Sequence, residues 1–482
     1  MSTDVRISES STPAAIFRRP ENGDAESDAP RDERNSHVPR RRLRLGAVWV
    51  VLSRSLGVGV TMLVNAVLAR WLSPEDFGSF LLLSSVLALA SLLAMLGLNT
   101  ALVRYVAESL GNQDVDRARR SLRLVLAVAA ISVTSVACLT ALGLSMIDTR
   151  VLGLPTVTGL VPMAVTSLVL LAVLQLIAEA CRSLHEIRLA SLFSGGQTGG
   201  LLSNLLFLLM IAAAVVLAKP SFATAVALNM TAMLVSLPAA IAGLAWAGRQ
   251  RLGRVRQSQP SEPLSVRSML GFSTAMLAIQ LLTFATTQAD LWIAGIWCPR
   301  DQLALYGAAR RLVLLVALPL QMMNLTVMAS IAELFGQGRL GDLEKLLRSS
   351  ALLAAVPAVP VIAALLLWGG PILELLFGEF FRQAAVPLGI LAIGQLFLVG
   401  IGSSGGALEM SGNHRASLLV NSLSAMALLT FGTWAAWRFG IVGLATASAS
   451  VIAAQSLALW LLARRIVGVW THPRLRQSLS TT

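Results

Sequence analysis

Charged residues are scarce in this sequence. Asp, Glu, Lys and Arg make up 13% of its 482 residues, whereas soluble globular proteins carry about 25%. Apolar residues reach 55%, and the mean hydropathy is +0.73. Most apolar runs approach or exceed the roughly 20 residues that cross a bilayer as a helix. These proportions exclude a soluble enzyme and predict an all-α membrane protein.

Side chains that build catalytic or metal sites are also scarce. The chain has four His and three Cys; Cys138, Cys181 and Cys298 stand apart in apolar runs, without metal or redox spacing. No Gly-rich loop that could cradle a phosphate is present, so we expect neither ATP hydrolysis nor a cofactor. A membrane enzyme of polysaccharide polymerisation is the rival from another class. Its nearest carboxylate pair, Glu374 and Glu379, is better explained by a solvated interfacial loop.

Twelve apolar runs are candidates for transmembrane helices. They lie at roughly 45–70, 77–103, 122–146, 155–180, 189–218, 222–247, 268–297, 303–331, 347–369, 384–405, 416–437 and 440–463. The alternate loops that we assign to the cytoplasm hold 24 Arg and Lys residues, against six in the others. By the positive-inside rule, this alternation predicts a multi-pass protein of the cell inner membrane with both termini cytoplasmic. The net charge of +13 is thus a topology signal, and nucleic acid is not an expected partner.

An internal repeat divides the chain. An offset of 225 residues pairs Asn65 with Asp290, Pro74 with Pro299, and Asn99 with Asn324, among other identities and similarities. Six helices per half is an even number, so the halves form two parallel six-helix lobes with a substrate path between them. We predict a disordered cytoplasmic tail (1–43), an N-terminal lobe (44–248), a cytoplasmic linker (249–267), a C-terminal lobe (268–466) and a cytoplasmic tail (467–482).

Polar groups at membrane depth are costly, so they are candidates for a cavity between the lobes. Arg54 shares a helical face with Gly57, Thr61 and Asn65. In the predicted span 268–297, a comparable polar face consists of Gln280, Thr283, Thr287 and Asp290. Arg310 shares a face with Gln321 and Asn324, with Arg311 about 100° round. The candidate substrate-binding residues are Arg54, Asn65, Arg104, Asp290, Arg310, Arg311 and Asn324. The residues expected to form interhelical hydrogen bonds are Gln175, Glu179, Gln197, Asn204, Gln395 and Gln455.

Structural roles remain open for several of these candidates. Arg104, Arg310 and Arg311 lie near predicted helix ends and could extend to the membrane interface. Arg54 could pair with a carboxylate or with helix carbonyls, and Asp290 could be the structural partner of an arginine. The arginines outnumber Asp290, and guanidinium groups bind phosphate bidentately. The composition of the predicted cleft therefore favours an anionic cargo, such as a phosphorylated lipid head group.

Four segments carry a family resemblance. Residues 68–78 (LARWLSPEDFG) resemble the first periplasmic loop of Wzx-type polysaccharide flippases, of the multidrug/oligosaccharidyl-lipid/polysaccharide (MOP) exporter superfamily. Residues 96–105, 305–312 and 439–445 resemble parts of its second, eighth and twelfth helices. The resemblance implies a MATE-like, V-shaped bundle with a basic central cavity. It also implies movement of a polyprenyl-diphosphate-linked oligosaccharide across the membrane for lipopolysaccharide (O-antigen) or exopolysaccharide biosynthesis.

Two other transporter classes remain as alternatives. A drug or cation antiporter of the same superfamily would share the fold, but it would place more carboxylates in the cleft. A major-facilitator transporter also has two parallel six-helix lobes, and residues 111–120 are similar to one of its loops. That segment has one residue too many before its Asp-Arg pair. The expected partners are a lipid-linked oligosaccharide, membrane lipids and a proton or sodium ion; the sequence does not decide whether an ion or product consumption drives transport.

Overall fold

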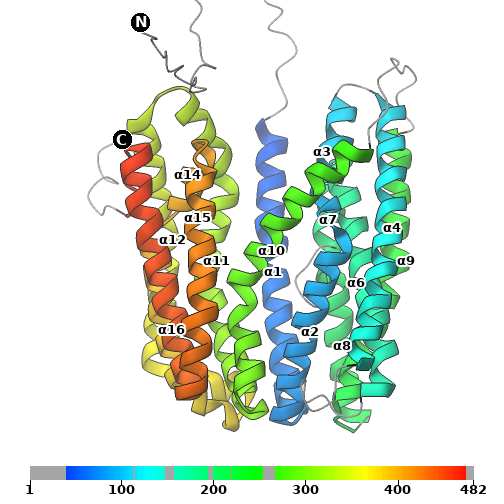
Figure 1. The fold of residues 1–482 in the computed structure, drawn as a ribbon, viewed down its shortest axis with the longest axis vertical. Coiled ribbons are helices and arrows are strands. Elements are labelled where there is room, and N and C mark those ends of the chain that lie inside the picture. The colour runs from blue at the N-terminus through cyan, green and yellow to red at the C-terminus, as the bar shows by residue number, and fades with distance from the viewer. Residues whose placement is uncertain are drawn as a thin grey trace, which may run out of the picture. The chain divides into compact units, whose positions relative to one another are not determined.

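The structure is a computed structural model that describes residues 40–111, 114–146, 157–193, 199–217, 219–252 and 266–473. All of its regular elements in these ranges are helical (Figure 1). Beyond the first residues of α1, the predicted N-terminal tail lies outside the described residues. The chain from Leu45 onward forms one compact unit.

The helices of the N-terminal lobe are α1 (Arg40–Trp71), α2 (Pro74–Met95), α3 (Leu98–Gly111), α4 (Val115–Met146), α6 (Val157–Ser183), α7 (Ile187–Phe193), α8 (Leu201–Leu217) and α9 (Phe222–Leu252). The C-terminal lobe has α10 (Val266–Trp297), α11 (Arg300–Gly336), α12 (Leu340–Phe377), η2 (Glu379–Ala384), α13 (Ala385–Ile401), α14 (Ser404–Met410), α15 (His414–Ala427), η3 (Leu428–Gly432), α16 (Thr433–Leu462) and η4 (Ala463–Val467).

The number of helices agrees with the predicted total of about twelve. The described residues contain ten helical segments long and apolar enough to cross a membrane, and α8 is a shorter apolar helix. One of the ten, His414–Val467, has non-helical backbone angles at Gly440. Gln455 Nε2 donates to Asn421 Oδ1 at 2.8 Å, 34 residues away, whereas a straight helix would separate them by about 51 Å. The segment therefore folds back on itself as two helices.

Large apolar side chains on the outer surface fit a membrane environment. Ile131, Ile296, Leu367 and Leu375 are each more than two-thirds exposed. In water such surfaces promote association, whereas lipid tails are as apolar as these side chains. The exposed apolar surface is thus consistent with the spans predicted from hydropathy.

The predicted span 77–103 is broken into α2 and α3. Leu96 and Gly97 have positive φ values of 47° and 72°, and a Cβ at position 97 would overlap the backbone oxygen of Ser273 on α10. Glycine alone combines that backbone conformation with such a close approach. The corresponding helix of the C-terminal lobe, α11, runs unbroken from Arg300 to Gly336. The repeat therefore preserves the helix order but not this break.

Close contacts join the two lobes at the ends of α1 and α2. Arg70 donates from Nε to the carbonyl oxygen of Leu376 at 3.1 Å. Phe77 and Phe381 meet edge to face, with ring centroids 5.8 Å apart. A Cβ on Gly78 would lie 2.6 Å from the backbone oxygen of Arg300, and small residues allow membrane helices to approach in this way. These contacts close the inter-lobe seam at the C-terminal end of α1.

The start of the predicted C-terminal tail packs against the C-terminal lobe. Thr471 is fully buried, and its hydroxyl donates to the carbonyl oxygen of Ile401 at 2.7 Å. The Arg464 guanidinium lies 4.7 Å from the ring centroid of Trp470. Residues 474–482 of this tail lie outside the described residues.

Candidate functional site

A cavity of about 790 Å³ lies between the lobes. Helices α1, α6, α7 and α8 of the N-terminal lobe and α11 of the C-terminal lobe contribute its walls. The residues lining it are Ser53, Arg54, Gly57, Val58, Thr61, Met62, Asn65, Glu179, Arg182, Ile187, Ser191, Leu201, Asn204, Arg311, Leu314, Leu315, Leu318, Gln321 and Met322.

The α1 wall carries a polar stripe. Arg54, Gly57, Thr61 and Asn65 follow one another at spacings of three or four residues, which places them on one helical face, and all four line the cavity. The Thr61 hydroxyl donates to the Gly57 carbonyl at 2.8 Å, and Asn65 Nδ2 donates to the Thr61 carbonyl at 2.6 Å. Asn204 Nδ2 on α8 donates to Thr61 Oγ1 at 3.3 Å. This part of the cavity offers neutral amide and hydroxyl groups.

The charged groups of the cavity are mostly guanidiniums. Arg54, Arg182 and Arg311 line it together with one carboxylate, that of Glu179. Arg182 Nη1 donates to both carboxylate oxygens of Glu179, at 2.8 and 2.9 Å. Arg54 is exposed, and no described residue forms a hydrogen bond or ion pair with it. The lining therefore carries a net positive charge of two, contributed by both lobes.

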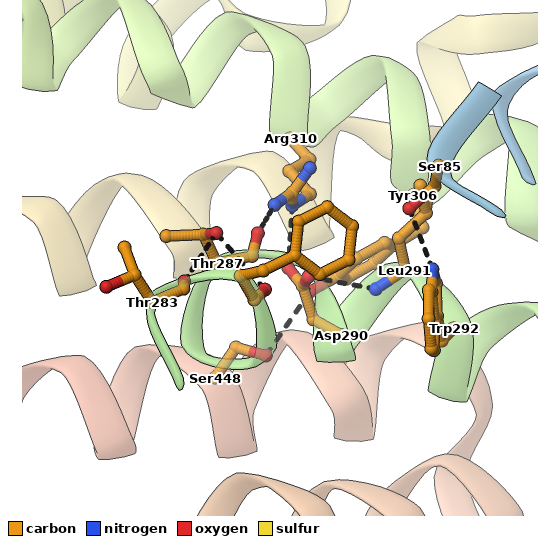
Figure 2. Close-up of polar contacts among 10 residues, drawn as sticks. Ser85, Thr283, Thr287, Asp290, Leu291, Trp292, Tyr306, Arg310 and Ser448 are labelled. Atoms are coloured by element: carbon orange, nitrogen blue, oxygen red, sulfur yellow. Dashed lines mark hydrogen bonds and ion pairs between the residues drawn. The ribbon is translucent and has the colours of Figure 1, made fainter. Parts of the chain in front are cut away.

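Arg310 lies outside this lining, in a polar cluster within the C-terminal lobe (Figure 2). Arg310 Nε donates to Asp290 Oδ2 at 2.8 Å, and the two side chains are 11% and 12% exposed. Arg310 Nη2 also donates to the carbonyl oxygen of Thr287. The Tyr306 hydroxyl donates to Asp290 Oδ2 at 3.0 Å and lies 3.3 Å from the Ser448 hydroxyl. The cluster connects α10, α11 and α16.

The structure corrects the predicted face of α11. Gln321 was expected to share a face with Arg310, but it lines the cavity together with Arg311. Adjacent positions on a helix point about 100° apart, and here Arg311 is among the lining residues whereas Arg310 is not. Arg310 turns instead toward the buried carboxylate of Asp290. The structural role considered for Asp290, as the partner of an arginine, is the one that the structure shows.

Two other candidates lie elsewhere in the inter-helix contacts. The Arg104 guanidinium lies 4.5 Å from the Phe272 ring centroid, where α3 meets α10. Asn324 Oδ1 accepts a hydrogen bond from the Ser403 hydroxyl. Of the seven candidates, the cavity brings together Arg54, Asn65 and Arg311. Arg104, Asp290, Arg310 and Asn324 are not among its lining residues.

Some polar lining residues were missed from the sequence as cavity groups. Arg182 is one of the 24 basic residues of the loops assigned to the cytoplasm, and Glu179 and Asn204 were expected only to connect helices. The spacing of Glu179 and Arg182 is a possible signal, because residues three apart on a helix are neighbours. Among the described residues, no group of three His, Cys, Asp or Glu side chains could hold a metal ion.

Comparisons with known proteins agree with this fold. A family described as "Polysaccharide biosynthesis protein" matches residues 43–331, and one described as MatE matches residues 275–435. No curated protein sequence matches the chain.

Among solved structures, the lipid II flippase MurJ in an inward closed conformation has a TM-score of 0.64 and 11% identity, covering 87% of each chain. An inward-facing multidrug resistance MATE family transporter of the MOP superfamily has a TM-score of 0.67 and 13% identity, covering 87% of this chain and 98% of that one. A mutant of the MATE transporter VcmN from Vibrio cholerae has a TM-score of 0.61 and 16% identity, covering 89% and 96%. At these identities the likeness is one of fold.

Proposed function

Because this chain belongs to the polysaccharide biosynthesis protein family, we propose that it is a flippase for a polyprenyl-diphosphate-linked oligosaccharide. It moves this cargo from the inner to the outer leaflet of the cell inner membrane, for biosynthesis of a surface polysaccharide such as O-antigen or exopolysaccharide. The observation that carries the proposal is the excess of guanidinium groups in the cavity between the lobes.

The charges of the cavity suit a diphosphate. Guanidinium groups remain charged at any physiological pH and match phosphate oxygens with paired N–H donors. Arg54 belongs to the N-terminal lobe and Arg311 to the C-terminal lobe. A diphosphate between them would contact both lobes. In transporters of two matching halves, a central site of this kind is exposed alternately to the two sides as the halves rock.

The size of the cavity suits a head group without its lipid tail. A volume of about 790 Å³ lies within the 300–1,000 Å³ typical of small-molecule sites. Hydroxyl and amide groups of Thr61, Asn65 and Gln321 are suited to sugar hydroxyls. The polyprenyl tail stays in the bilayer, because each CH₂ group withdrawn from lipid would cost about 0.8 kcal/mol.

The cargo enters from the cytoplasm in the state described here. Arg182, Ile187 and Ser191 line the cavity close to the turn between α6 and α7, which the distribution of basic residues assigns to the cytoplasmic side. The opposite end of the lobes is packed around Arg70 and Phe77. We therefore place the loading side on the cytoplasmic face.

A drug or cation antiporter is the second candidate, and the MatE match over residues 275–435 favours it. The charge of the cavity argues against it, because a cationic cargo would meet three guanidinium groups and one carboxylate. Like charges at close range repel one another. The polysaccharide-lipid cargo is therefore the better match to the described geometry.

Transport in vesicles separates the two candidates. The purified chain is reconstituted with a fluorescent polyprenyl-diphosphate sugar, and a membrane-impermeant quencher reports the fraction in the outer leaflet. We expect lipid movement without ATP, and its loss in Arg54→Gln and Arg311→Gln. Arg104→Gln is the matched control, because Arg104 is exposed and lies outside the cavity lining. Efflux of a cationic dye with no lipid movement would establish the antiporter instead.

A further inference from the structure

Glu179 is unexpected in a cavity suited to anions. It is the single carboxylate among the residues that line the cavity, and its side chain is only 16% exposed. Its partner Arg182 lies one turn along α6 and is 42% exposed. Partly exposed ion pairs at this spacing contribute little to helix stability. The stability of α6 therefore does not explain why a carboxylate lies in a cavity suited to anions.

The surrounding membrane gives such a carboxylate a use. Bacterial and other cytoplasmic leaflets present anionic phospholipids to any basic site at their surface. A cavity lined by Arg54, Arg182 and Arg311 alone would attract these abundant lipids as well as the cargo. Specific sites commonly reject competitors by including a repulsive element. Glu179 supplies one, since an anion must displace its two oxygens to engage Arg182 Nη1.

The displacement discriminates by charge. A phospholipid head group with one negative charge can contact Arg54 or Arg311, but it competes poorly with a carboxylate already paired with Arg182. A diphosphate carries more charge and more acceptor oxygens, and it can hold two guanidiniums while competing for the third. Displacing Glu179 from Arg182 therefore costs the phospholipid a larger share of its binding energy.

We propose that Glu179 is a specificity-determining residue: it holds Arg182 in the empty cavity and thereby favours diphosphate lipids over singly charged phospholipids. This inference rests on the proposed function, because it takes a diphosphate lipid as the cargo. Glu179 acts through Arg182, so its effect requires that the arginine be present.

A competition experiment tests the inference. The full chain is placed in nanodiscs of phosphatidylcholine, or of phosphatidylcholine mixed with phosphatidylglycerol, and titrated with geranylgeranyl diphosphate as the probe. For the wild type we expect phosphatidylglycerol to raise the apparent Kd by about twofold or less. For Glu179→Gln we expect about tenfold, the size typical of losing one close charge interaction. Glu108→Gln, the same change at an exposed residue outside the cavity lining, should match the wild type.

The outcomes are distinct. In an Arg182→Gln background, Glu179→Gln should have no further effect, because the two residues act as one unit. Unchanged discrimination in Glu179→Gln, or the same loss in both backgrounds, would overturn the role of Glu179. Glu179→Ala repeats the test should the Gln variant not be monodisperse. Failure of the wild type to bind the probe in phosphatidylcholine would instead remove the proposed function.

Discussion

Arg310 and Arg311 are adjacent in the sequence, yet their side chains lie in different environments. Arg310 pairs with Asp290 inside the C-terminal lobe, and Arg311 lines the cavity. We therefore predict that Arg310→Gln destabilises the protein and spares anion binding. Arg311→Gln should do the reverse.

The size of the first effect follows from the burial of the pair. Both side chains of the Arg310–Asp290 pair are nearly nine-tenths buried. Removing one partner of a buried ion pair typically costs about 3–5 kcal/mol of folding free energy. Asp290 keeps hydrogen bonds from the Tyr306 hydroxyl and the Leu291 N–H, so we expect the lower end, about 3 kcal/mol. At about 2 °C per kcal/mol for a large domain, the loss of Tm is about 6 °C. Asp290→Asn combined with Arg310→Gln should recover about half, since no charge is then left unpaired.

The assay combines unfolding with binding. Thermal unfolding of the detergent-purified chain is followed by the fluorescence of its ten tryptophans, and geranylgeranyl diphosphate is titrated into each variant. For Arg311→Gln we expect the affinity to fall about 10- to 100-fold, because hydrogen bonds between charged groups contribute about 1.5–3 kcal/mol. The reasoning is refuted if Arg310→Gln keeps its Tm and loses diphosphate binding.

The other predictions concern the inter-lobe seam and the topology. Gly97→Ala should cost about 1–3 kcal/mol, because it places a Cβ at positive φ against the Ser273 backbone. Gly271→Ala, on the open side of α10, is the control and should keep Tm or raise it slightly, because alanine favours an unobstructed helical position. Arg70→Gln should lower Tm by about 2 °C or less, since its hydrogen bonds to α12 carbonyls are exposed and contribute at most about 1 kcal/mol; a loss of about 6 °C would contradict this. A reporter fused near Arg150 should score as periplasmic; a cytoplasmic score there would disprove the orientation inferred from basic residues.

The helical fold, the approximate number of spans and the polar face of α1 could all be predicted from the sequence. Insertion of a helix depends on its own apolar length, because every backbone hydrogen bond in lipid must be satisfied within the segment. The face shared by Arg54, Thr61 and Asn65 follows from the helical period, which relates residues of one helix without reference to any neighbour.

The side chains that each helix presents to its neighbours could not be predicted in this way, because they depend on tertiary packing. The helical period separates Arg310 from Arg311 but does not predict which of them lines the cavity. That choice depends on the Asp290 carboxylate of another helix, which pairs with Arg310. Glu179 and Arg182 line the cavity because the end of α6 lies near α1 of its own lobe and α11 of the other lobe. The break at Gly97 likewise depends on the backbone of α10. Packing between segments that are distant in sequence sets the rotation of each helix about its axis. The hydropathy of a single segment therefore does not predict this rotation.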